Sequence, residues 1–228
     1  MVTFGIVLPT WIYSRSRGIW ADAAFRDLVR TERPSNIPQL LLLLGSANYA
    51  YPLELLGTVF RCTALPQPEN VSGTEQTLAY GTEWMLRETD ATHIVWLGDD
   101  ALFNPRWLIE LEGLIGRHPE ARAHSVYRSA YEYVHKTLAE DGKDVLVRSL
   151  CGHGLTFTRE EWAAWGIQWQ QGKMWTNPHG GETLDLHHVW ARPGERWVTR
   201  QSYIDHTGKT GFHCQPQIPE YARDFVSQ

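Results

Sequence analysis

The stretch THIVWLGDDALFNPRWL, residues 92–108, decides the predicted fold of this chain. Residues 93–97 form a short apolar run without polar alternation, which is typical of a strand buried on both faces of a parallel sheet. Gly98 ends this run. Asn104 and Pro105 then indicate the start of a helix, because Asn caps helices well and Pro suits the first helical position. The stretch therefore predicts a central strand, a loop and an amphipathic helix.

Two carboxylates, Asp99 and Asp100, lie where this strand meets the loop. Ligands of open α/β sheets bind outside the carboxyl ends of the strands. Adjacent carboxylates at that place suit a divalent cation that also contacts the phosphates of a ligand. A plain polar turn is the alternative, because turns favour Asp. The buried strand before the pair and the helix after it favour the ligand site.

The length, amino-acid composition and net charge limit the class of protein. The chain has 228 residues, of which 43% are hydrophobic and 21% charged, so it fits one soluble α/β domain with a sizeable core. No run is long enough to span a bilayer, and the first residues lack a signal-peptide pattern. Three widely spaced cysteines favour free thiols in a reducing, cytoplasmic compartment. The net charge of −5 argues against a broad surface that tracks nucleic-acid phosphates.

Apolar runs alternate with helical patterns along the rest of the chain. Residues 3–8 and 39–44 are expected as buried strands, and residues 19–29 between them as a helix. Residues 14–18 form a short basic loop whose two arginines are expected in solvent, with contact to phosphates as the alternative. Residues 55–61 fit either a helix end or a third strand. This alternation predicts an α/β fold with a mostly parallel central sheet flanked by helices. Residues 122–133 are expected to supply another strand and an active-site loop, and later strand-like runs cover residues 144–150 and 196–204.

The buried strand, the small residue, the acid pair and the helix started by Pro resemble the DXD region of GT-A fold glycosyltransferases, especially those of family 2. Asp100 matches the metal-binding acid of that region, and Gly98 stands where the family has its first acid. The loop and helix of residues 69–88 and the acidic GGETLDL stretch at 180–186 are also similar to family segments. The motifs occur in the family order across residues 3–208.

The resemblance implies a single GT-A domain, the Rossmann-like fold of nucleotide-diphospho-sugar transferases, over residues 1–208. Residues 1–100 would form its nucleotide-binding half and residues 101–208 its acceptor half. Residues 209–228 would form a C-terminal extension or flap.

The resemblance also implies where the donor is bound. The turn after the first strand would hold the nucleotide, with an indole stacked on the base, and the loop before the helix of residues 73–88 would lie against the nucleotide-sugar. A small-residue loop, CGHG at 151–154, would contact the donor from the other side. The implied nucleotide-sugar-binding residues are Pro9, Thr10, Trp11, Asn70, Gly73, Gln76, Asp99, His153 and Gly154.

In the acidic stretch, the resemblance implies a catalytic base at the start of a helix. The second acid of the family is replaced here by Thr183, so Glu182 is expected as the base, with Asp185 as the second candidate. Acids at a helix start also complement the helix dipole, which is the structural alternative. His206, in a turn after the last predicted strand, would complete a metal site with Asp100. A nitrogen ligand beside carboxylates suits Mn²⁺, and Mg²⁺ is the other candidate cofactor.

The implied activity is the transfer of a sugar, with inversion, from a nucleotide-diphosphate donor, above all a UDP-sugar, to an acceptor hydroxyl. The acceptor would be a glycan, a small molecule or a modified nucleic acid such as DNA with a hydroxylated base, and Tyr127, Arg128 and Tyr131 are candidates for acceptor contacts. One alternative is a non-catalytic protein of the same fold that binds nucleotide-sugar or glycan, because Thr183 replaces an acid and the strand end at Gly45 lacks one. The other is a zinc protein built on the ten histidines, although none of their spacings matches a closed structural zinc site.

Overall fold

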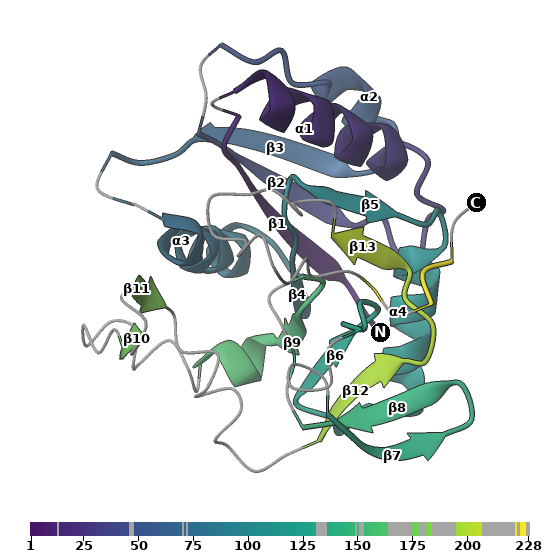
Figure 1. Cartoon of the computed structure of the whole chain (residues 1–228). Helices are drawn as coiled ribbons and strands as arrows, with labels where there is room; N and C mark the ends of the chain where they lie inside the picture. Colours follow the sequence, from purple (N-terminus) through teal and green to yellow (C-terminus); the bar gives the residue numbers. More distant parts are fainter. Residues whose placement is uncertain are drawn as a thin grey trace.

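The structure is a computed structural model of the chain, drawn in Figure 1. It describes residues 1–12, 14–45, 48–69, 71, 73–130, 136–148, 150, 153–163, 175–177, 181–183, 195–206, 222 and 224–226. For residues 16, 73–75, 175–177 and 181–183 only the backbone is described.

One nine-stranded sheet forms the centre of the fold. Its strands are β1 (Phe4–Thr10), β2 (Gln39–Leu44), β3 (Arg61–Pro66), β4 (His93–Trp96), β6 (Ala123–Ser125), β7 (Thr137–Asp141), β8 (Asp144–Val147), β9 (Thr156–Thr158) and β12 (Arg196–Thr199). Their order across the sheet is β3-β2-β1-β4-β9-β6-β12-β8-β7. β3, β2, β1 and β4 run parallel, whereas β9 is antiparallel to both β4 and β6. Both predicted halves of the domain therefore contribute strands to one sheet, and the predicted α/β class is confirmed.

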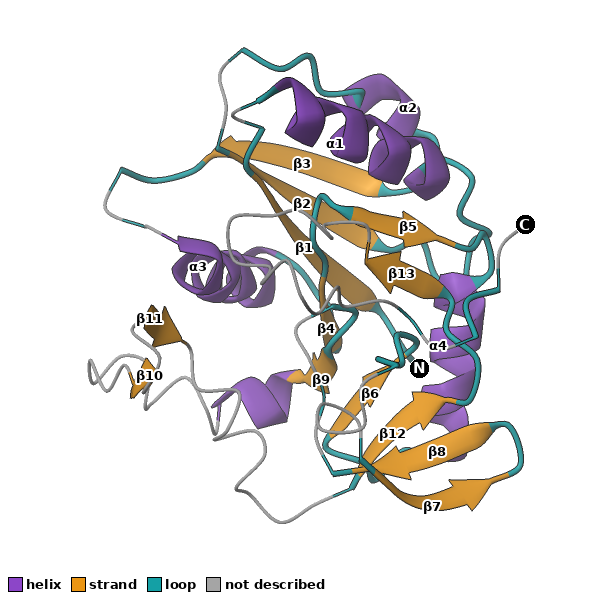
Figure 2. Cartoon of the chain, in the orientation of Figure 1, coloured by secondary structure: helices purple, strands orange, loops and turns teal. Residues whose placement is uncertain are grey.

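Helices cover both faces of this sheet. The helices labelled in Figure 1 are α1 (Arg15–Leu28), α2 (Leu53–Gly57), α3 (Gly73–Glu88) and α4 (Trp107–Arg117), and residues 159–163 are helical as well. α1, α2 and α4 share one core with the sheet and α3 lies in another, on the opposite face (Figures 1 and 2). In β1, Phe4, Ile6 and Leu8 pack with the first group and Val7 packs with α3, which is why this strand is apolar throughout. Among the described helices, none has the length and apolar character needed to cross a membrane.

α3 approaches β1 closely at Gly81. A Cβ atom at this position would lie 2.3 Å from Cγ1 of Val7, so glycine allows the helix to lie this near the strand. Trp96, at the end of β4, packs beneath the same helix and donates from Nε1 to the hydroxyl of Thr82 at 2.9 Å. These contacts fix α3 against the strands at whose carboxyl ends the predicted site lies.

Within the described residues, two further sheets have two strands each. β5 (Ala101–Phe103) directly follows the acid pair and runs antiparallel to β13 (Ile204–His206), so that His206 lies opposite Ala101 (Figure 1). β10 (Trp175–Asn177) pairs with β11 (Gly181–Thr183). The β5–β13 pair thus brings the last predicted site residue next to the acids.

Two predictions about single elements are wrong. Residues 196–204, expected as one strand, form β12 and β13 in different sheets. The chain turns between them, where the Thr199 hydroxyl donates to the Gln201 carbonyl at 2.7 Å. Glu182, expected at a helix start, lies in β11, where β-branched Thr183 suits a strand.

The end of the chain returns to the domain. Ala222 forms a β-bridge with Ser129 and donates its amide to Oδ1 of Asp205 at 2.9 Å. Asn104 donates from Nδ2 to the Val226 carbonyl at 2.9 Å. The described residues of the predicted C-terminal extension therefore pack beside β13.

Candidate functional site

Asp99 and Asp100 follow the carboxyl end of β4, in the middle of the central sheet. Gly98 ends the strand, and a Cβ atom there would lie 2.7 Å from Oδ1 of Asp100. The Asp100 carboxylate thus folds back over Gly98.

Arg17, in the first turn of α1, lies between the two acids. Its Nη1 donates to Oδ2 of Asp100 at 2.8 Å, and its Nη2 donates to Oδ1 of Asp99. Ser14 caps α1 and accepts a hydrogen bond from the Arg17 amide at 3.3 Å. The Arg17 side chain is only 17% exposed, so the prediction that the basic loop lies in solvent is wrong for this residue. The acid pair draws it inward, and no local pattern in residues 14–18 reveals that partner.

Asp99 ties the acid pair to the turn after β1. Its side chain is buried, and its Oδ2 accepts a hydrogen bond from the Trp11 amide at 2.9 Å. The indole of Trp11 packs against Gly45 at the end of β2, where a Cβ atom would lie 2.0 Å from Cδ1 of the indole. Trp11 is still 37% exposed, which leaves part of the ring open to a stacking partner.

The other predicted donor contacts are less accessible or lie outside the described residues. Thr10 is buried, and its hydroxyl donates to the Leu43 carbonyl at 3.0 Å and contacts the Tyr51 hydroxyl at 2.8 Å, so it supports the turn. Pro9 is half-buried in β1. Gly73 begins α3 and half-buried Gln76 follows in its first turn, whereas Asn70 is not among the described residues.

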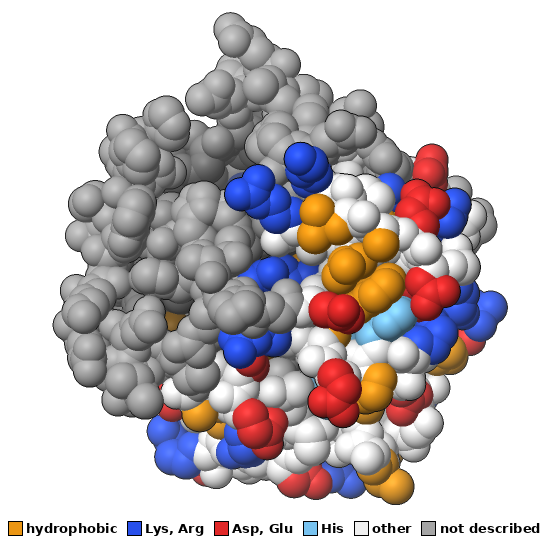
Figure 3. Space-filling view, turned by 90° about the horizontal axis from the view of Figure 1, so that it is seen from below, with side chains coloured by type: hydrophobic (Ala, Val, Ile, Leu, Met, Phe, Trp, Pro, Cys, Tyr) orange, Lys and Arg blue, Asp and Glu red, His pale blue; other side chains and the backbone are white. Residues whose placement is uncertain are grey.

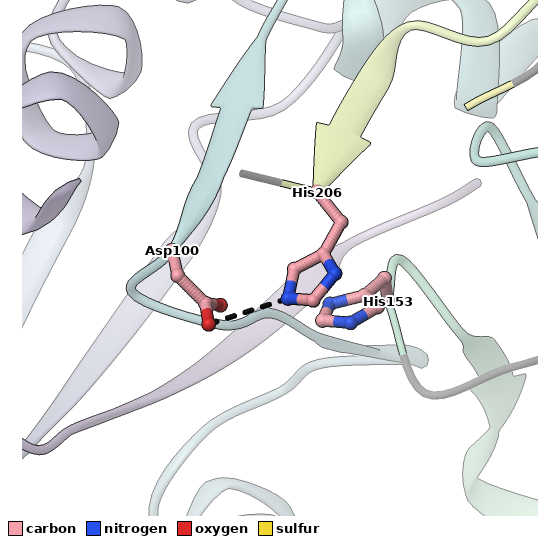
Figure 4. A group of neighbouring side chains, drawn as sticks. All are labelled: Asp100, His153 and His206. Atoms are coloured by element: carbon pink, nitrogen blue, oxygen red, sulfur yellow. Dashed lines mark hydrogen bonds and ion pairs between the residues drawn. The ribbon is translucent and has the colours of Figure 1, made fainter. Parts of the chain in front are cut away.

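Three potential metal ligands converge from distant parts of the chain: Asp100, His153 and His206. Their ligand atoms all lie within 4.8 Å of one another. Nε2 of His206 lies 3.3 Å from Oδ2 of Asp100, and the rings of His153 and His206 stack with centroids 4.1 Å apart (Figure 4). One carboxylate and two imidazoles form a donor set that suits a divalent transition metal.

Burial and charge act differently on these groups. Burial raises the pKa of Asp100, but the hydrogen bond from His206 and the charge of Arg17 outweigh it and hold the pKa well below its usual range. Burial raises the pKa of Asp99 to about 6, although Arg17 opposes the shift. Burial lowers the pKa of His153 to about 4, so its imidazole is neutral near pH 7 and keeps a lone pair for a ligand.

The loop before β9 fixes the backbone of His153. The Ser125 hydroxyl donates to the His153 carbonyl at 3.3 Å, and the Gly154 amide donates to the Trp96 carbonyl at 2.9 Å. Gly154 has a φ of +66°, which favours glycine at this position. The predicted donor-binding loop therefore lies beside the acid pair, and its histidine faces the metal candidates.

The structure does not describe the side chains of the predicted bases. Glu182 has a described backbone in β11, and Asp185 lies outside the described residues, so their roles stay predictions. Two of the acceptor candidates are buried: Tyr127 is inaccessible, and Arg128 donates to the Arg200 carbonyl at 3.1 Å. These two side chains support the fold rather than face an acceptor. Tyr131 lies outside the described residues.

A pocket of about 620 Å³ is lined by the first half of α1 and by Asn48 and Tyr49. The sequence did not predict it. Asp22 of α1 accepts a hydrogen bond from the Tyr49 hydroxyl. Its carboxylate lies in the lining of this pocket, whereas the end of β2 carries no acid. Its lining residues are Ile12, Ser14, Arg15, Gly18, Ile19, Asp22, Asn48 and Tyr49.

Comparison of the structure with solved proteins identifies the fold. A structure of S. aureus TarS 1–349 in complex with UDP-GlcNAc matches with a TM-score of 0.57 at 8% identity, over 89% of this chain and 58% of that one. TarS 1–349 in complex with UDP matches with a TM-score of 0.56 at 9% identity, over 89% and 60% of the two chains. A longer TarS structure matches with a TM-score of 0.60 at 11% identity, over 89% of this chain and 36% of that one.

This likeness confirms the predicted GT-A-like fold and, at such low identity, the fold alone. The chain spans less than two thirds of each of these TarS chains. No protein-family model matches the sequence, and no curated protein is similar to it.

Proposed function

We propose that this chain is a glycosyltransferase that moves a sugar from a UDP-sugar to an acceptor hydroxyl with the help of a divalent cation. The observation that carries the proposal is the meeting of Asp99, Asp100 and His206 at the carboxyl end of β4 in a GT-A-like fold. TarS, which has this fold, has been solved with UDP-GlcNAc and with UDP. UDP is therefore the nucleotide we propose.

The residues present fit a divalent cation. The Asp100 carboxylate and the His206 imidazole lie close together, and the low pKa of Asp100 keeps this carboxylate charged at neutral pH. These two residues would hold Mn²⁺ or Mg²⁺. When bound, the ion would neutralise the negative charge that develops on the leaving nucleoside diphosphate.

Other residues would bind and orient the donor. The exposed part of the Trp11 indole would stack on the base. The pocket between α1 and Tyr49 has a volume suited to a nucleoside, and Asp22 and Asn48 in its lining would accept and donate hydrogen bonds to ribose or base. Arg17 would contact the diphosphate, because a guanidinium binds phosphate oxygens in pairs.

In the proposed reaction, the acceptor oxygen forms a bond to the anomeric carbon while the bond from that carbon to the diphosphate oxygen breaks. The proton of the acceptor hydroxyl passes to Glu182 or, as the second candidate, to Asp185, and the diphosphate leaves with the electron pair. Attack opposite the leaving group inverts the anomeric centre. A positioned base of this kind contributes about 10²–10⁴-fold to the rate.

The surface bears on which acceptor to test first. Figure 3 shows one face of the molecule from below, where several Lys and Arg side chains lie along the edge of the described part. The net charge of −5 argues against a broad surface that tracks nucleic-acid phosphates. A glycan or a small molecule with a free hydroxyl is therefore the first acceptor to screen, and a modified nucleic acid the second.

Thermal unfolding tests donor binding. The purified chain would be melted with UDP, GDP, CDP, TDP and their sugars, each with and without Mn²⁺. A ligand that binds only the native state raises the melting temperature by mass action. We expect UDP and one UDP-sugar to raise it in a metal-dependent way, and Asp100→Ala to abolish the shift.

Asp141→Asn is the matched control, because Asp141 is an exposed acid in β7, away from the acid pair. It should keep the full shift. Absence of a shift with every nucleotide, or an equal shift in Asp100→Ala, would contradict the proposed donor site.

The second candidate function is a non-catalytic nucleotide-sugar or glycan-binding protein of the same fold. The feature that favours it is Thr183 at the position of an expected acid. Sugar transfer by the wild-type chain with Glu182→Gln and Asp185→Asn as paired variants separates the two functions. A transferase loses turnover in at least one variant while UDP still binds, whereas a binding protein shows UDP-sugar binding and no turnover in any form.

A further inference from the structure

We propose that His153 is a third protein ligand of the cation, which makes the centre an aspartate with two histidines. The sequence resemblance assigned His153 to the donor sugar and only Asp100 and His206 to the metal. The inference deepens the proposed function, and it rests on that function for the assumption that these two residues hold an ion.

The geometry supports one shared ion. The ligand atoms of the three side chains lie within 4.8 Å of one another, and atoms bound to one transition metal lie about 3 Å apart, so a small closure suffices. The two imidazole rings stack with an interplanar angle of 29° next to the carboxylate (Figure 4). Because the nitrogen lone pairs lie in the ring planes, a rotation of the His206 ring would direct a nitrogen of each ring to one shared ion.

Three separate elements hold these ligands in place. Asp100 follows β4, His206 ends β13 opposite Ala101, and His153 lies in the loop before β9. The Tyr127 ring meets the His153 ring edge to face at 5.7 Å, on the inside of the fold. The His153 ring is thus packed between Tyr127 and His206, which limits its rotation away from Asp100.

The ligand set predicts which metals bind. Two imidazoles and one carboxylate favour Mn²⁺, Fe²⁺, Co²⁺ and Zn²⁺ over Mg²⁺ and Ca²⁺, which prefer oxygen ligands. Three protein ligands also leave positions open for diphosphate oxygens. We therefore expect Mn²⁺ or Co²⁺ to bind without nucleotide, and Mg²⁺ not to displace an equal concentration of Co²⁺.

Metal binding to the full chain tests the inference without any activity assay. Mn²⁺ affinity would be measured by titration calorimetry, and the number of bound nitrogens by pulsed electron paramagnetic resonance. We expect two imidazole nitrogens in the wild type and one in His153→Gln, with affinity lowered at least about tenfold, since loss of even a supporting partner costs roughly 10–100-fold. His93→Gln is the matched control, because His93 lies at the opposite end of β4 and should leave both readings unchanged.

A second variant gives a positive signal. In His153→Cys loaded with Co²⁺, a thiolate at the metal should add a sulfur-to-cobalt charge-transfer band in the near ultraviolet that the wild type lacks. Unchanged affinity and nitrogen count in His153→Gln, or no new band in a folded His153→Cys, would overturn the inference.

Melting the same variants with UDP separates this failure from failure of the proposed function. If UDP still binds with Mn²⁺ while His153→Gln behaves as wild type, only the third ligand is wrong. If the metal binds through two nitrogens but no nucleotide shifts the melting temperature, the ligand assignment stands and the donor proposal fails.

Discussion

Arg17 Nη1 lies 2.8 Å from Asp100 Oδ2, the same oxygen that His206 Nε2 contacts at 3.3 Å. The acid proposed to bind the metal thus already has a positive partner from its own chain. A divalent cation on that oxygen would repel the guanidinium, so loading of the site is expected to release Arg17 from Asp100. The diphosphate would then be its natural new partner.

Arg17→Gln should therefore tighten metal binding and weaken nucleotide binding. Removing one nearby positive charge is worth at least about 1 kcal/mol, its value in bulk water, so Mn²⁺ affinity without nucleotide should rise at least roughly fivefold. UDP affinity with Mn²⁺ should fall, because a phosphate contact is lost. Calorimetric titration measures both, with Arg26→Gln as control, since Arg26 is exposed on the same helix. If Arg17→Gln leaves both affinities unchanged, Arg17 does not move from Asp100 to the diphosphate when the metal binds.

The sequence predicts the central fold well where each strand carries its own signal. β1, β2 and β4 are apolar at nearly every position because both faces are buried, and this pattern is visible without any partner. The acid pair is equally visible, since it directly follows a buried run. The turn that separates β12 from β13 is not visible in the sequence, because it depends on contacts with the segment after β6. One of these is the hydrogen bond that the Ser202 hydroxyl accepts from the Arg128 amide at 2.8 Å.

The site is predictable only in part for the same reason. Motif order predicts that Asp100 and His206 lie together, but the position of Arg17 between two acids and the stacking of His153 on His206 arise from tertiary contacts between distant segments. Local patterns correctly describe His153 as a loop residue, whereas they place Arg17 in a loop although it lies in the first turn of α1. They contain no information on which segment each one meets.

Gly81→Ala should destabilise the protein, although alanine favours helices by about 1 kcal/mol over glycine. The added Cβ would lie 2.3 Å from Cγ1 of Val7 and 2.9 Å from Cδ1 of Leu43, and overpacking of a buried site costs about 1–3 kcal/mol. In Gly116→Ala of α4, the added Cβ would meet no atom within 4 Å, so this substitution should instead stabilise the protein. Urea unfolding measures both, and stabilisation by both variants would show that α3 does not need this close approach.

Deleting residues 222–228 should loosen β13 and with it the metal site. Asp205 would lose the Ala222 amide at 2.9 Å, and Asn104 would lose the Val226 carbonyl. Each hydrogen bond is worth about 0.5–1.5 kcal/mol, so the melting temperature and Mn²⁺ affinity should both fall. The control Asp224→Gly keeps the segment and relieves a positive φ of 50°, so it should not lower the melting temperature. Wild-type stability and metal affinity after the deletion would show that the chain end is dispensable.

His124 predicts how stability depends on pH. It is buried in β6, its Nε2 donates to the His118 carbonyl at 2.9 Å, and burial lowers its pKa to about 4. In the unfolded chain a histidine titrates near 6.5, so between pH 6.5 and 4 the unfolded state binds the extra proton. The contribution of His124 to the free energy of unfolding is therefore complete above about pH 6.5. It is lost as the pH falls toward 4, at up to about 1.4 kcal/mol per pH unit. The free energy of unfolding would be measured with urea from pH 7.5 to 4.5. It should fall less steeply with decreasing pH in His124→Gln than in the wild type, whatever stability the substitution removes at pH 7.5. Parallel curves would mean that His124 takes up no proton on unfolding.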